Sequence, residues 1–191
     1  MGVLVQVPGQ GNLSIAPAAN APLLVVFGGI DAHKLHSGVY MWNYMNPLGQ
    51  RFHIFVALSN QVNGTLAYDA LMKTVTDKGL NPSRQVLYLF SGGYKPGIDL
   101  LRGGTSRFEA IYLVDIWMGG ALVGGFSTSL ADHDALKMTY VYTIFGANNK
   151  VARDYIANKV APRATLISSL PHEGGVATHM RTNVTAVGTL R

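Results

Sequence analysis

The chain has 191 residues, of which 48% are hydrophobic and 13% are charged, so it is long enough for one folded domain and too apolar to be disordered. Fifteen Lys and Arg against 10 Asp and Glu give a net charge of +5, but the basic residues occur singly, which argues against a nucleic-acid interface. The chain has no cysteine, so disulfides, thiolate metal ligands and a cysteine nucleophile are excluded.

The amino-terminal segment shows no targeting pattern. Residues 1–8 lack the basic start and the apolar centre of a signal peptide. The longest apolar runs, such as residues 22–29, fall far short of the roughly 18 residues that a transmembrane helix needs. We therefore expect a single domain over residues 1–191 with no membrane span. Its compartment is unknown, with the cytoplasm as the default, and its oligomeric state is open.

Six short runs of β-forming residues have the composition of strands buried on both faces of a sheet. The first reads Leu-Leu-Val-Val-Phe and is followed by Gly28 and Gly29. Before it, the Gly-, Pro- and Ala-rich residues 8–22 are interpreted as a loop that leads into this strand. The six predicted strands are residues 23–27, 52–58, 86–90, 110–114, 139–145 and 165–168.

Helical spacing of apolar residues occurs between these strands. The clearest case is residues 65–78, where Ala67, Leu71 and Val75 share one face and Gly79 marks the end. The other predicted helices are residues 38–45, a segment around 98–101 and residues 150–159.

Strands that alternate with helices pair in parallel through right-handed crossovers, which places helices on both faces of the sheet. The sequence therefore predicts a doubly wound α/β domain with a mainly parallel sheet of about six strands. Ligands in such domains bind beyond the carboxyl ends of the strands. These ends carry Ser91, Asp115 and His172, in that order along the chain.

A serine on a sharp turn between a buried strand and a helix exposes its hydroxyl above the sheet, where a histidine can deprotonate it. The residues around Ser91 fit this context. The stretch Phe-Ser-Gly-Gly-Tyr-Lys-Pro at residues 90–96, followed by Ile-Tyr-Leu-Val-Asp at residues 111–115, resembles small bacterial members of the α/β-hydrolase superfamily without a large lid. The resemblance extends in element order over most of residues 22–180.

The resemblance implies an esterase-type serine hydrolase that acts on an acyl-bearing small molecule and needs no cofactor or metal. Ser91 would be the nucleophile, His172 the general base and Asp115 the acid that orients it. The oxyanion would be bound by the N–H of Gly92 and by a further N–H from the glycine loop. The donors in that loop would be Gly29 or Ile30.

Three residues are expected to line the substrate site, namely His33, Tyr94 and Trp117. For His33 the alternative is a position facing solvent, and for Trp117 it is packing in the core. His33 also belongs to a possible metal-ligand set with Asp31 and His36, which would make the chain a metal-dependent hydrolase instead.

The residue two before the serine leaves a second alternative open. A nucleophile elbow reads Gly-x-Ser-x-Gly, whereas this chain has Leu89 at the first glycine position. A register with Ser91 at that small position would put Gly93 in place of the nucleophile. The chain would then be a catalytically inactive binding or assembly protein with the same fold.

The acid and the base also have alternatives. Many members of the superfamily carry the acid after the following strand, where this chain has Asn148 and Asn149. Asp115 could equally cap the next helix. His179, seven residues after His172, is the rival base.

Overall fold

The structure is a computed structural model, which describes residues 2–29, 45, 48–102, 108–114, 137–142 and 164–169, the last two ranges by their backbone alone. These residues form the following strands, helices and 3-10 turn: β1 (Val3–Val7), β2 (Gly11–Ile15), β3 (Leu23–Phe27), β4 (His53–Ala57), α2 (Gly64–Asp77), β5 (Gln85–Phe90), η2 (Ser91–Gly93), α3 (Tyr94–Arg102), β6 (Ala110–Val114), β7 (Lys137–Tyr142) and β8 (Ala164–Ser169).

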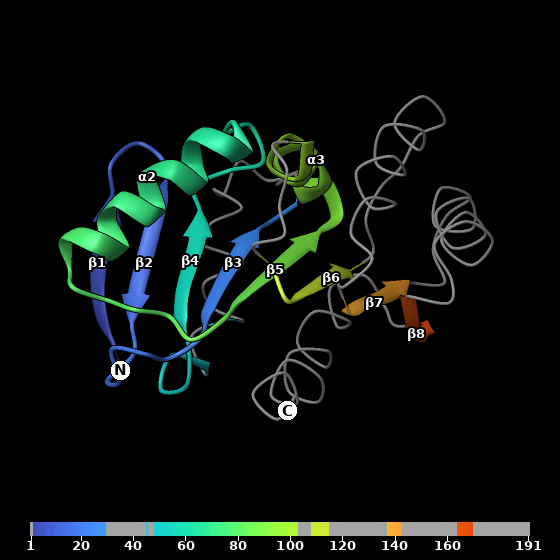
Figure 1. Cartoon of the computed structure of the whole chain (residues 1–191). Coiled ribbons are helices and arrows are strands. Elements are labelled where there is room, and N and C mark those ends of the chain that lie inside the picture. Colours follow the sequence, from blue (N-terminus) through green and yellow to red (C-terminus); the bar gives the residue numbers. More distant parts are fainter. Residues whose placement is uncertain are drawn as a thin grey trace.

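All eight of these strands belong to one sheet, in the order β1-β2-β4-β3-β5-β6-β7-β8 (Figure 1). β1 pairs with β2 and β2 with β4 in antiparallel fashion. Every pairing from β4 across to β8 is parallel. The predicted doubly wound α/β architecture with a mainly parallel sheet is confirmed, and each of the six predicted strands is present.

β1 and β2 are strands that the sequence analysis did not predict. The loop interpretation of residues 8–22 was wrong for β2, because Leu13 is fully buried in the sheet. The turn between the two strands is made by Gly9, whose φ of 70° favours glycine, and closed by the N–H of Gln10, which donates to the carbonyl of Val7. Pro8, Gly9 and Gly11, at the turn and at the start of β2, are the residues that favoured the loop interpretation.

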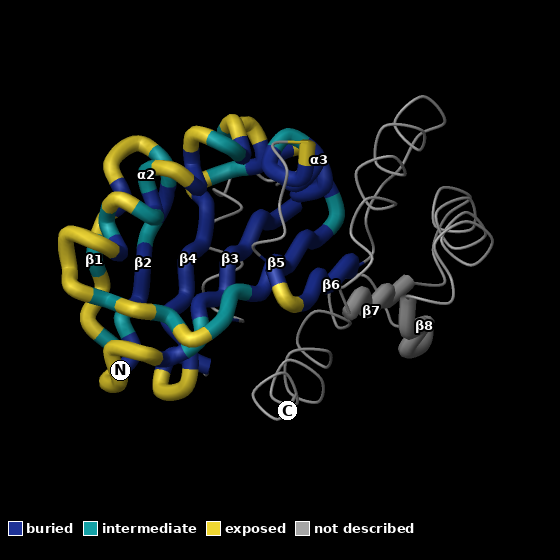
Figure 2. Tube along the Cα trace, in the orientation of Figure 1, coloured by how far each residue is buried: buried dark blue, intermediate teal, exposed yellow. Residues whose placement is uncertain are grey.

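The central strands β3, β4, β5 and β6 are buried on both faces of the sheet, whereas most of β1 is exposed (Figure 2). In β3, Leu23, Val25 and Phe27 belong to the core cluster on the face that α2 and α3 cover, and Leu24 and Val26 belong to a second cluster on the opposite face. This double burial explains why the central strands read as continuous apolar runs instead of alternating ones.

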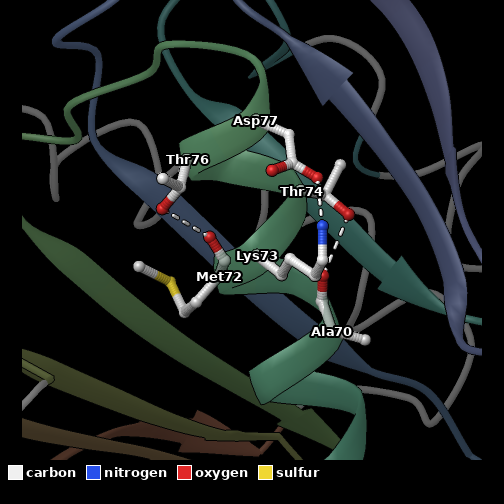
Figure 3. Close-up of polar contacts among 6 residues, drawn as sticks. All are labelled: Ala70, Met72, Lys73, Thr74, Thr76 and Asp77. Carbon is white, nitrogen blue, oxygen red and sulfur yellow. Dashed lines mark hydrogen bonds and ion pairs between the residues drawn. The ribbon is translucent and has the colours of Figure 1, made fainter.

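α2 begins and ends close to the predicted bounds of residues 65–78. Its N-cap residue, Asn63, accepts a hydrogen bond of 3.0 Å from the N–H of Leu66. Its apolar face, including Leu71 and Val75, is buried against the sheet. On its outer face, Lys73 and Asp77 form an exposed ion pair of 2.6 Å (Figure 3).

α3 extends the predicted segment around residues 98–101 in both directions, and it starts directly after η2. The other predicted helices, residues 38–45 and 150–159, lie outside the described residues except for Met45, which is buried. Within the described part of the chain, no helix has the length and apolar character needed to cross a membrane.

Candidate active site

Ser91 lies at the junction where β5 ends and η2 leads into α3. Its φ of 50° makes it the one non-glycine residue with a left-handed backbone among the described residues. Such a conformation costs about 1–3 kcal/mol and persists only where surrounding contacts enforce it. A strained serine between a buried strand and a helix is the backbone geometry of a nucleophile elbow.

The backbone also bears on the alternative register. Among the described glycines, only Gly9 and Gly79 have a positive φ, so Gly93 does not. The left-handed residue at the apex of the turn is therefore Ser91. This geometry argues against the register in which Gly93 stands at the nucleophile position.

The loop after β3 lies directly against Ser91. A Cβ added to Gly29 would lie 2.8 Å from Ser91 Cβ and 3.1 Å from Ser91 Oγ, so only glycine leaves room for the serine side chain. β3 and β5 are neighbours in the sheet, with Phe27 in register with Leu89. The parallel pairing thus brings the predicted glycine loop and the predicted nucleophile to the same edge of the sheet.

Gly93 packs against the end of β3 and the residue that follows it. A Cβ at this position would lie 2.7 Å from the carbonyl carbon of Phe27 and 2.8 Å from the carbonyl oxygen of Gly28. These are main-chain atoms, which cannot move aside as a flexible side chain can. The second small residue of the elbow is therefore required by a close approach between two backbone segments.

Leu89 stands at the position where the elbow pattern has its first glycine. Its large side chain fits there because the facing residue on α3, Gly97, has no side chain. The side chain of Leu89 is fully buried in the cluster beneath α3. A Cβ added to Gly97 would lie 2.8 Å from Leu89 Cδ2. The sequence analysis missed Gly97. Its role depends on where α3 starts, which the sequence pattern did not reveal.

The remaining predicted residues that the structure describes are Gly92 and Tyr94. Gly92 follows Ser91 directly and is buried. Tyr94 is the first residue of α3, is 1% exposed and belongs to the core cluster beneath the helices. Burial raises the pKa of its hydroxyl, which keeps the group protonated. Its position is explained by packing, and a role in lining the substrate site stays a prediction.

Five predicted site residues lie outside the described residues: Ile30, His33, Asp115, Trp117 and His172. The register of β5 and β6 nevertheless bears on one of them. Phe90 pairs with Val114, the last residue of β6, and these two are followed in the chain by Ser91 and Asp115.

His53 is the one histidine among the described residues, and its position excludes it as the base. It begins β4 at the amino end of the parallel strands, whereas Ser91 follows the carboxyl end of β5. Its Nδ1 accepts a hydrogen bond of 3.1 Å from the N–H of Ala16, and its Nε2 donates one of 3.1 Å to the carbonyl of Ala19. Both ring nitrogens are thus used to hold the loop before β3.

No group of three potential metal ligands gathers among the residues that the structure describes. The possible ligand set of Asp31, His33 and His36 lies outside them.

The sequence and the structure were compared with those of known proteins. No protein-family model and no curated protein matches the sequence. Solved structures do match over nearly the whole chain. A cold-adapted esterase from an Arctic intertidal metagenomic library, solved with zinc bound, has a TM-score of 0.67 and 13% identity, and the match covers 98% of this chain and 92% of that one.

Two further structures have a TM-score of 0.62. One is a predicted CIB-like hydrolase from Thermoplasma acidophilum, with 13% identity and a match covering 100% of this chain and 98% of that one. The other is the fluorophosphonate-binding serine hydrolase F of Staphylococcus aureus, with 9% identity and coverage of 98% and 97%. With the strand order and the turn at Ser91, these matches show that the chain has the fold of the α/β-hydrolase superfamily.

Proposed function

We propose that this chain is a serine hydrolase that cleaves an ester or a related acyl compound, with Ser91 as its nucleophile. The observation that carries the proposal is the left-handed φ of 50° at Ser91, at the junction of a buried strand and a helix. Structures of similar fold include an esterase and a serine hydrolase, which supports the same chemistry.

In the proposed reaction, Ser91 Oγ forms a bond to the substrate carbonyl carbon while its proton passes to His172. The negative charge that develops on the carbonyl oxygen is bound by the N–H of Gly92 and by one from Gly29 or Ile30. His172 then gives the proton to the leaving oxygen as the C–O bond breaks. Water repeats the sequence on the acyl-enzyme, which releases the acid and restores Ser91.

Asp115 is proposed to orient the imidazole and to stabilise its charge. The support is topological. Asp115 follows β6, which pairs directly with β5, and the last residues of these strands, Val114 and Phe90, are in register. Ser91 and Asp115 therefore each follow a paired residue at the carboxyl end of two neighbouring strands.

The test is labelling of the full chain with a fluorophosphonate probe, which reacts covalently with an activated serine. We expect the native chain and the Ser83→Ala variant to be labelled, because Ser83 is an exposed serine just before the amino end of β5, at the opposite end of this strand from Ser91. We expect Ser91→Ala to lose the label. A folded native chain that takes no label would contradict the proposal and favour the inactive binding protein.

The same assay separates the rival bases. His172→Ala is expected to reduce the labelling rate by about a hundredfold or more, since the serine then lacks its general base, while His179→Ala leaves the rate nearly unchanged. The reverse pattern would make His179 the base. Hydrolysis of a chromogenic acetate ester that survives in Ser91→Ala and is abolished by a chelator would point to the metal-dependent alternative.

A further inference from the structure

The space that lets Leu89 sit two residues before Ser91 is supplied by a residue on the facing helix. Leu89 is fully buried, and Gly97, eight residues later on α3, lies against the end of its side chain. In the Gly-x-Ser-x-Gly elbow the small residue is on the strand. Here the strand carries the large side chain and the helix carries the small one.

The start of α3 is fixed by close contacts on three sides. Gly93, just before the helix, lies against the end of β3, and Gly97 lies against Leu89 on β5. From the third side, α2 approaches so closely that a Cβ on its Gly64 would lie 2.6 Å from the carbonyl carbon of Pro96. Thr65 on α2 also donates a hydrogen bond of 3.1 Å to the carbonyl of Asp99.

These contacts hold the start of α3 against β3, β5 and α2. A methyl group at Gly97 would have to displace either Leu89 or the first turns of the helix, because Leu89 is enclosed by the core. α3 follows η2 without an intervening loop, so a displaced helix also displaces Ser91. The left-handed backbone of Ser91 depends on such surrounding constraints.

We propose that Gly97 is a positioning residue for the nucleophile, which acts through Leu89 by keeping α3 close to β5 and so holding Ser91 in its left-handed conformation. This inference rests on the proposed function of Ser91. The inference concerns the pair of residues. A side chain added at Gly97 is expected to disturb the backbone at Ser91 while Leu89 is intact, and to be tolerated once the side chain of Leu89 is shortened.

The experiment is a double-mutant cycle with Gly97→Ala, Leu89→Ala and the double variant. Its first readout is fluorophosphonate labelling, separated into the apparent affinity for the probe and the maximal rate constant. We expect Gly97→Ala to lower the maximal rate constant by about tenfold or more, the loss that a misplaced catalytic group produces, with little change in affinity. Adding Leu89→Ala to Gly97→Ala should recover most of that loss, because the new methyl group then has room.

The control is Leu13→Ala, which removes a buried leucine from β2, a strand separated from β5 by β4 and β3. We expect this variant to unfold at a lower urea concentration but to keep the native labelling rate constant while it is folded. Two results would overturn the inference and leave the proposed function standing. One is a labelling loss in Gly97→Ala that persists in the double variant with Leu89→Ala, and the other is an equal labelling loss in Leu13→Ala.

A second readout does not depend on labelling. Ser91→Gly is expected to raise the urea midpoint of the native chain, because glycine adopts a positive φ without strain. In the Gly97→Ala background this gain should shrink, since Ser91 is no longer held in the left-handed region. An equal gain in both backgrounds would overturn the inference, even in a chain whose lack of labelling had already overturned the proposed function.

Discussion

At the scale of single residues, the site depends on which positions lack a side chain. Gly29 is the sharpest case, because a Cβ there would meet both the Cβ and the Oγ of Ser91. The sequence analysis named Gly29 as a source of an oxyanion donor. The structure adds a steric reason, which is that no larger residue fits beside the serine.

We therefore expect Gly29→Ala to reduce fluorophosphonate labelling by about a hundredfold, the effect of losing an aligned oxyanion donor. Gly11→Ala is the matched control, because its added Cβ would lie 2.7 Å from Phe55 Cε2 on β4, and β4 and β3 separate its strand, β2, from β5. Both variants are expected to lose stability in urea, and only Gly29→Ala should lose labelling. Equal labelling of the two would contradict the placement of Gly29 beside the nucleophile.

At the scale of elements, the sequence predicted β3, β4, β5 and β6, which are buried along nearly their whole length, and missed β1, which is mostly exposed. β3, β5 and β6 were predicted to within one residue, because double burial demands an uninterrupted apolar run. β1 lies at one edge of the sheet and is exposed over most of its length, and its run Val-Leu-Val-Gln-Val was not recognised as a strand although its residues are β-forming. An edge strand gains its structure from one neighbour, which a local pattern does not reveal.

The helix before the elbow offers a test of local sequence control. Asn63 accepts a hydrogen bond from the N–H of Leu66 at the start of α2. We expect Asn63→Ala to lower the free energy of unfolding by about 1 kcal/mol, and Asn63→Asp to retain it, since a carboxylate accepts the same bond. Urea denaturation measures both.

Lys73→Ala on the same helix is the comparison, because it removes only the exposed ion pair with Asp77 (Figure 3). Such exposed pairs contribute less than about 0.5 kcal/mol on a helix. A larger loss for Lys73→Ala than for Asn63→Ala would show that the surface pair, and not the cap, stabilises α2.

At the scale of the whole molecule, a site residue could be predicted where its place follows from the general architecture, and not where it depends on a contact between two elements. Ser91 was predicted as the nucleophile because the residue after a central strand lies at the ligand-binding edge of a doubly wound sheet. Gly97 was not found, since its contact with Leu89 forms only when α3 folds back onto β5. Composition and periodicity describe one element at a time, whereas this contact belongs to two.

On the face of the sheet opposite α2 and α3, two buried tyrosines lead us to predict that the fold loses stability at alkaline pH. Tyr88 and Tyr112 stack on neighbouring strands with ring centroids 6.2 Å apart, and both are buried. Burial raises the pKa of Tyr112 to about 12 from its usual value of 10. Burial, together with the charge that Tyr112 would carry, raises the pKa of Tyr88 still further.

Between pH 10 and pH 12 the unfolded chain therefore releases phenolic protons that the folded chain retains, so the free energy of unfolding should fall as the pH rises. Below pH 10 both states keep these protons, and the stabilisation is fully present. We expect Tyr112→Phe to show a shallower fall in urea midpoint over this interval, with the remaining slope coming from Tyr88 and other titrating groups. Comparison with the same variant at pH 7 separates this slope from any constant loss of stability. Parallel pH profiles for the native chain and Tyr112→Phe would mean that the phenol titrates in the folded state as it does in the unfolded one, and that this face of the sheet admits water.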